Sequence, residues 1–151
     1  MNLLYVENKH DDILLYTIPL KILQKLKEKL SECLFSNNNE NDFISYIKTQ
    51  DECSLFISKN LLHSYFSESE KELINYLKEQ KKYISFKFYE KNTGISQVGI
   101  VNKISEVFSE INIPIIYVNS YENNYILMES YYKEHAINTL LQYDDFKFIE
   151  L

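Results

Sequence analysis

The order of hydrophobic patterns in the second half of the chain constrains the fold more than any other feature. Apolar side chains occupy alternate positions in residues 83–90, which predicts a strand, and recur at three- and four-residue spacing in residues 97–111, which predicts a helix. The next patterns are two strands, a helix and a strand, at residues 115–119, 125–128, 130–141 and 146–149. This order predicts a ferredoxin-like unit, an antiparallel sheet with both helices on one face.

The first half contains a similar set of patterns. They are two short strands, a helix and a hairpin, at residues 3–6, 13–16, 20–34, 43–49 and 53–58. Ser67 and Glu70 then form a capping-box signature for a second helix. We therefore predict an α+β fold of two ferredoxin-like βαββαβ lobes, residues 1–81 and 82–151, without a linker. The place of the extra N-terminal strand stays open between the two sheets.

Composition limits the classes of partner. The net charge is -6, and all 16 basic residues are lysine, so the chain offers no guanidinium group for bidentate recognition of phosphate or guanine. We expect no nucleic-acid partner. No apolar run approaches the ~20 residues that span a bilayer, and the first residues turn acidic where a signal peptide would be cleaved. The expected location is the cytoplasm, without membrane contact.

The ionisable and nucleophilic residues do not form a catalytic pattern. Cys33 and Cys53 fall on apolar faces and are expected to be buried thiols. The three histidines are scattered, without the spacing of metal ligands. We therefore predict a protein that is not an enzyme and that needs no cofactor or metal.

The start of the predicted helix at residues 97–111 is the main candidate binding site. Its residues are Ser96, Gln97, Val98, Gly99 and Ile100. The first N–H groups of a helix lack partners within it and attract carboxylates, and Gly99 lets a ligand or a neighbouring chain come close to the backbone. The alternative is structural: Ser96 caps the helix and Gly99 packs against a strand.

Three stretches resemble an ACT-domain pair of the kind found in CASTOR-type arginine sensors and their small bacterial relatives. They are the segment LYTIPL at residues 15–20, the helix start SQVGI at residues 96–100, and the strand-turn-strand segment at residues 116–128. With the order of elements, the resemblance covers nearly the whole chain. It implies a regulatory protein that binds an amino acid or a similar small carboxylate at an interface between ACT lobes.

The resemblance also places the turn of residues 119–124 beside the helix start. There Asn119, Ser120 and Asn124 would supply neutral hydrogen bonds and Tyr121 a wall, whereas a plain polar hairpin is the alternative. Relatives often carry Asp at the positions of Gly94 and Asn124. Both departures remove a carboxylate that could pair with a guanidinium group, which speaks against arginine as the ligand.

Two expectations about partners follow from the resemblance. A single chain of this kind is expected to form a homodimer through the helix at residues 97–111 and the strand at residues 115–119. The alternative is a monomer whose two lobes pair with each other. The alternative function is a protein–protein interaction module whose ligand pocket has decayed.

Overall fold

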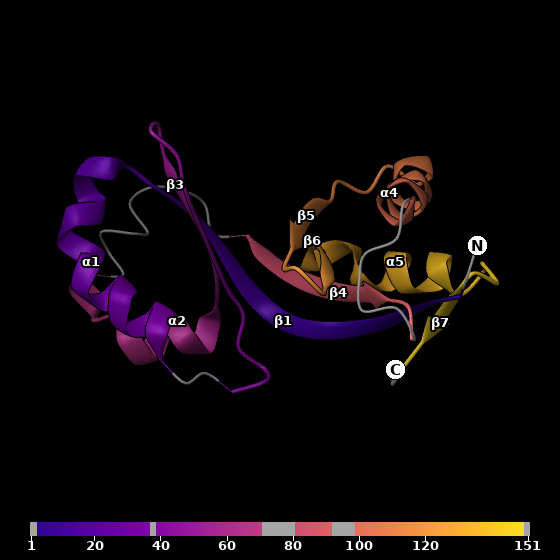
Figure 1. Cartoon of the computed structure of the whole chain (residues 1–151), viewed down its shortest axis with the longest axis horizontal. Coiled ribbons are helices and arrows are strands. Elements are labelled where there is room, and N and C mark those ends of the chain that lie inside the picture. The colour runs from indigo at the N-terminus through magenta and orange to yellow at the C-terminus, as the bar shows by residue number, and fades with distance from the viewer. Residues whose placement is uncertain (1–2, 37–38, 71–80, 92–98, 150–151) are drawn as a thin grey trace. The chain divides into compact units, whose positions relative to one another are not determined.

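The computed structural model describes residues 3–36, 39–70, 81–91 and 99–149 (Figure 1). The chain forms two compact units. One, called here the inserted unit, comprises residues 12–83, and the other, called the split unit, combines residues 1–11 with residues 84–151. No helix in the described part of the chain is long and apolar enough to cross a membrane.

The inserted unit has a mixed strand and helix content. Its elements are β1 (Leu4–Ile18, shared with the split unit), α1 (Leu20–Phe35), β2 (Ile44–Lys48), β3 (Cys53–Ser58) and α2 (Lys59–Tyr65). The strands lie in the order β2-β3-β1, and both neighbouring pairs are antiparallel. Alternate residues of β1 and β3 form one core with Leu23, Leu26 and Leu30 of α1.

The split unit has the predicted order strand-helix-strand-strand-helix-strand. Its elements are β4 (Lys82–Tyr89), α4 (Ile100–Glu110), β5 (Ile116–Asn119), β6 (Asn124–Glu129), a short 3-10 helix η1 (Ser130–Tyr132), α5 (Lys133–Leu140) and β7 (Phe146–Phe148). The strands β1, β4, β6 and β5 lie in that order, and β7 pairs in parallel with β1. Both α4 and α5 pack on one face of this sheet (Figure 1). The predicted α+β, ferredoxin-like order is therefore confirmed.

The core of the split unit explains why α4 lies on that face. Ile84, Phe86 and Phe88 alternate along β4, and Ile104 and Phe108 lie one helical turn apart on α4. All five are at most 2% exposed and belong to one cluster. The alternation along β4 and the helical spacing along α4 each give an apolar face, and these two faces pack against each other.

The first strand differs from the prediction. The patterns at residues 3–6 and 13–16 belong to the single 15-residue strand β1, in which polar residues 7–12 also have strand geometry. Leu4–Val6 pair with β7 of the split unit, and Ile13–Ile18 pair with β3 of the inserted unit. The observed units thus differ from the division into residues 1–81 and 82–151, because the N-terminal strand packs with the C-terminal part of the chain.

Two further helices follow β3, and only the second was predicted. The helix α2 was not predicted, because it has only seven residues and follows β3 without a turn residue. The predicted capping box is confirmed. The backbone N–H of Ser67 donates to Glu70 Oε1 at 3.1 Å, and the N–H of Glu70 donates to Ser67 Oγ at 3.3 Å. Most of the helix that it was predicted to begin lies outside the described residues.

Candidate functional site

The helix α4 begins at a glycine in a left-handed conformation. Gly99 has φ 94° and ψ -9°, and its carbonyl accepts the N–H of Lys103 at 3.0 Å. A residue with a Cβ atom is strained at this φ, so the helix start depends on glycine. Ile100 is 2% exposed and anchors the first turn in the core of the split unit. Ser96, Gln97 and Val98 lie outside the described residues.

The turn between β5 and β6 is closed by one backbone hydrogen bond and one side-chain hydrogen bond. The N–H of Ser120 donates to the carbonyl of Asn123 at 3.1 Å, and Asn123 Nδ2 donates to Ser120 Oγ at 3.3 Å. Asn119 and Asn124 are the last paired residues of the two strands. These contacts explain how the hairpin turns without Gly or Pro, because amide and hydroxyl groups supply the local hydrogen bonds.

The predicted turn residues differ widely in exposure. Asn119 and Ser120 are exposed, and the side chain of Tyr121 is 83% exposed. Asn124 is 4% exposed, so its amide lies inside the split unit. A role of Tyr121 as the wall of a site would therefore need a ligand or a partner chain that covers its ring.

The Asn124 side chain is engaged on both sides. Its Oδ1 accepts the hydroxyl of Tyr117 at 2.8 Å, and its Nδ2 donates to the carbonyl of Phe88 at 3.5 Å. Burial raises the pKa of the Tyr117 phenol, while a hydrogen bond with the Asn119 side chain acts in the opposite direction. Asparagine can accept and donate at the same time, whereas an ionised aspartate can only accept. The two protein partners of this buried side chain, one donor and one acceptor, thus explain why asparagine occupies the position.

Tyr117 links the turn to the core of the split unit. Its ring packs against the same core cluster that contains Ile100 of α4, and its hydroxyl binds Asn124 at the end of the turn. The helix start and the turn are therefore parts of one packed body. A helix start and exposed neutral polar groups each have chemistry that is suitable for binding a small carboxylate.

Sequence reasoning missed a groove in the inserted unit, between α1 and β2. It has a volume of about 270 Å³. Its lining consists of Leu23, Gln24, Lys27, Leu30, Ser31 and Leu34 of α1 with Tyr46 and Lys48 of β2. Three leucines make part of the lining apolar, and two lysines add ammonium groups. A carboxylate with a short apolar side chain has the complementary chemistry.

A signal for this groove existed, but it was incomplete. Lys27, Ser31 and Leu34 recur at helical spacing, and Tyr46 and Lys48 alternate on one face of a strand. The pairing of β2 with β3, and the packing of α1 on that sheet, place the two sets together. Neither contact can be read from local sequence.

The two thiols are buried, as the sequence predicted. Cys33 and Cys53 are free cysteines in the core of the inserted unit. Burial raises the pKa of the Cys33 thiol to about 11, with a further contribution from Asp42, and burial also raises the pKa of Cys53. At neutral pH both thiols are protonated, which makes them poor nucleophiles. Within the described part of the chain, no group of three or more His, Cys, Asp or Glu side chains is placed to hold a metal ion.

Comparison with known proteins gave one family match, to part of the chain. Residues 78–142 match the ACT domain family, a stretch that contains α4, β5, β6 and α5. A comparison with curated proteins gave no match. The fold is similar to that of a protein from Agobacterium tumefaciens, with TM-score 0.63 and 13% identity over 100% of this chain and 97% of that chain.

Two further similar structures come from aspartate kinases. The ligand-free regulatory subunit of aspartate kinase from Thermus thermophilus gives TM-score 0.56 and 15% identity over 91% of this chain and 95% of that subunit. Escherichia coli aspartokinase III, solved with lysine and aspartate, gives TM-score 0.52 and 14% identity over 92% of this chain but 32% of the enzyme. At these identities the likeness concerns the fold, which is the ACT ferredoxin-like fold.

Proposed function

We propose that the protein is a non-catalytic regulatory protein that binds an amino acid or a similar small carboxylate. The observation that carries the proposal is the left-handed Gly99 at the start of α4, within the stretch that matches the ACT domain family. The likeness to the regulatory subunit of an aspartate kinase and to an aspartokinase solved with lysine supports it. The ligand's identity within this class is left to the experiment.

The proposed site is the start of α4 with the turn after β5. The ligand carboxylate would meet the backbone at Gly99 and Ile100, preceded by Ser96, Gln97 and Val98. Asn119 and Ser120 are exposed and carry polar groups that reach solvent, so they would bind the polar end of the ligand. Asn124 would act differently, because its amide is held by Tyr117 and Phe88. It would fix the position of the turn.

We also propose that the protein forms a homodimer through α4 and β5. Val101 of α4 is 47% exposed, and β5 ends the strand order of its sheet. A two-fold contact there would pair the exposed edge of β5 with its copy and cover Val101. It would bring the start of α4 close to the partner chain, where Tyr121 could be covered. A stable interface of this kind buries more than about 1,000 Å² in total.

An interaction module with a decayed pocket is the second candidate. The observation that favours it is the internal use of the Asn124 amide, which is satisfied by protein groups. In that case the exposed Tyr121 and Val101 would meet a partner protein in the absence of a small ligand. Retention of a stoichiometric protein partner in ligand-free buffer, with no response to any amino acid, is the result that this alternative predicts.

A thermal-shift screen against the twenty amino acids tests the leading proposal. At 100 times its dissociation constant a ligand stabilises the folded protein by about 2.7 kcal/mol, which is a measurable rise in Tm. The rise should be lost in Gly99→Ala and kept in Asn138→Ala, an exposed change on α5. If no amino acid at millimolar concentration changes the Tm, the proposal fails. If the rise survives Gly99→Ala but is lost in Lys48→Met, the ligand binds the α1–β2 groove instead.

A further inference from the structure

Two stacked tyrosines lie on the face of the split-unit sheet that points away from its helices. Leu4 and Val6 of β1 belong to the core beneath the helices, so Tyr5 between them lies on the opposite face. Phe88 of β4 belongs to the same core, which places the next residue, Tyr89, on the face of Tyr5. The two ring centroids are 5.8 Å apart, and the ring planes differ by 25°. Both residues are partly exposed, so the stacked pair borders solvent.

Three lysines surround this pair of rings. The Lys91 and Lys147 ammonium groups lie 5.4 Å and 6.0 Å from the centroid of the Tyr5 ring. The Lys87 ammonium group lies 5.2 Å from the centroid of the Tyr89 ring. Such cation–π contacts are weak at an exposed site, but they hold the ammonium groups beside the rings. We call these five residues the tyrosine–lysine face.

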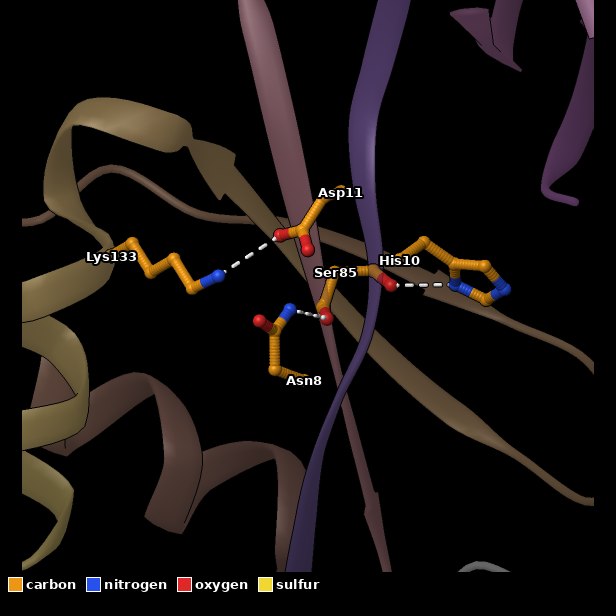
Figure 2. Close-up of polar contacts among 5 residues, drawn as sticks. All are labelled: Asn8, His10, Asp11, Ser85 and Lys133. Carbon is orange, nitrogen blue, oxygen red and sulfur yellow. Dashed lines mark hydrogen bonds and ion pairs between the residues drawn. The ribbon is translucent and has the colours of Figure 1, made fainter. Parts of the chain in front are cut away.

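The positive charge of this face is not balanced by ion pairs. Two other lysines of the split unit have carboxylate partners: Lys133 pairs with Asp11 at 3.2 Å (Figure 2), and Lys103 pairs with Asp145 at 2.9 Å. Among the residues that the structure describes, none of the three lysines of the tyrosine–lysine face forms an ion pair with a carboxylate. In a chain of net charge -6, this face is therefore a local excess of positive charge.

The arrangement favours carboxylates over nucleobases as the groups that bind here. A base that stacks on an aromatic side chain needs a free ring face, but the Tyr5 ring already has Tyr89 and two ammonium groups as neighbours. Each ammonium group has three N–H donors, and a contact with a ring leaves donors for an acceptor such as a carboxylate. Glu7 lies near the face, because burial and then the charge of Glu7 raise the pKa of Tyr89. This carboxylate and the net charge of -6 both repel a long polyanion such as nucleic acid.

We propose that the tyrosine–lysine face binds an acidic segment of a partner protein. Carboxylates of that segment accept hydrogen bonds from the three ammonium groups, and the two rings supply the apolar contact between them. Tyrosine is enriched in protein–protein interfaces, where its ring and its hydroxyl can both make contacts. Because α4 packs on the other face of the sheet, this surface is separate from the proposed ligand site.

Fluorescence anisotropy with the full chain tests the proposal. The probe is a short labelled peptide of alternating glutamate and glycine, titrated at low salt. The double variant Lys91→Gln/Lys147→Gln removes two exposed charges from the face and should weaken binding about fivefold. The control is Lys21→Gln/Lys25→Gln, which makes the same change of net charge on exposed residues of α1. It should change the affinity by less than about twofold.

Two further probes show which group the face recognises. A peptide of alternating glutamine and glycine should not bind, because it lacks the carboxylates. A single-stranded oligothymidylate should bind more weakly than the acidic peptide. The proposal is overturned if the acidic peptide does not bind at millimolar concentration, or if both double variants lose the same affinity, which is a response to net charge alone. Tighter binding of the oligothymidylate also overturns it, since the partner is then a nucleic acid.

Discussion

The hydroxyl of Tyr117 donates a 2.8 Å hydrogen bond to Oδ1 of Asn124, which is 4% exposed. This bond joins the first strand of the candidate-site hairpin to the end of its turn. The amide of Asn124 also donates to the Phe88 carbonyl at 3.5 Å. Three strands therefore meet at one side chain, and both of its polar atoms have protein partners.

Replacement of Asn124 by aspartate should destabilise the protein by about 1–3 kcal/mol, because a buried carboxylate cannot donate to the Phe88 carbonyl. Chemical denaturation at pH 7.5 gives the free energy of unfolding. Asn138→Asp, the same change at an exposed position of α5, is the control and should stay within about 0.5 kcal/mol of wild type. Equal losses in both variants would show that the Asn124 contacts do not contribute to stability.

Tyr16 should make the protein sensitive to alkaline pH. Burial raises the pKa of its phenol to about 12, and its hydroxyl has no hydrogen-bond partner within the described part of the chain. Above pH 10 the unfolded chain loses this proton while the folded chain retains it, so stability falls as pH rises toward 12, by roughly 2–3 kcal/mol. Below pH 10 both states are protonated, and the effect is absent.

Denaturation series from pH 8 to pH 11 can isolate this effect. Tyr16→Phe removes both the titrating group and the unsatisfied hydroxyl, so it should be at least as stable as wild type at pH 8 and should lose part of the alkaline decline. Tyr121→Phe, at a position where the ring is 83% exposed, should follow the wild-type curve. If the stability of Tyr16→Phe falls with pH as steeply as that of wild type, Tyr16 does not cause the alkaline loss of stability.

The Ser67–Glu70 capping box should contribute about 0.5–2 kcal/mol to stability, which Ser67→Ala would remove. Hydrogen bonds from Ser67 lower the pKa of Glu70. The ionised Glu70 carboxylate therefore contributes to stability at pH values above the usual pKa range of a carboxyl group, and this contribution is lost as pH falls. Ser64→Ala is the contrasting variant, because the Ser64 hydroxyl donates to the Asn60 carbonyl within a helix, where alanine is at least as favourable. The same loss in both variants would contradict a specific cap.

Gly99→Ala should cost about 1–2 kcal/mol in the free energy of unfolding, since alanine is strained at φ 94°. Asn112, with φ 56° after the end of α4, offers the reverse experiment. Its replacement by glycine relieves strain and should cause no loss of stability. Urea denaturation of both variants decides the point. An unchanged stability of Gly99→Ala would mean that the helix can begin without glycine.

Local pattern was sufficient for much of the split unit. The spacing of Ile104 and Phe108 predicts α4, because it matches the period of a helix. The alternation of apolar residues from Tyr83 predicts β4, because it matches the period of a strand. The predicted turn after β5 is also correct, since Ser120 and Asn123 form it through local hydrogen bonds. Such features depend on residues that are close together in sequence.

The rest depends on contacts between distant residues. His10, Asp11 and Asp12 interrupt the apolar pattern of β1, and their partners Ser85, Lys133 and Lys82 lie about 70 residues or more away in the sequence. A polar run of this kind looks like a loop until those partners are known. The α1–β2 groove was missed for the same reason, because its two walls come from elements that meet only through the sheet.

Amide chemical-shift mapping can show whether a small carboxylate binds at the start of α4. The ligand with the largest thermal shift is titrated into isotopically labelled protein while backbone amide signals are recorded. Saturable shifts are expected at Gly99 and Ile100 and at Asn119 and Ser120, and they should be lost in Gly99→Ala. Saturable shifts confined to α1 and β2, or no saturable shift from any of the twenty amino acids at millimolar concentration, would contradict binding at this site.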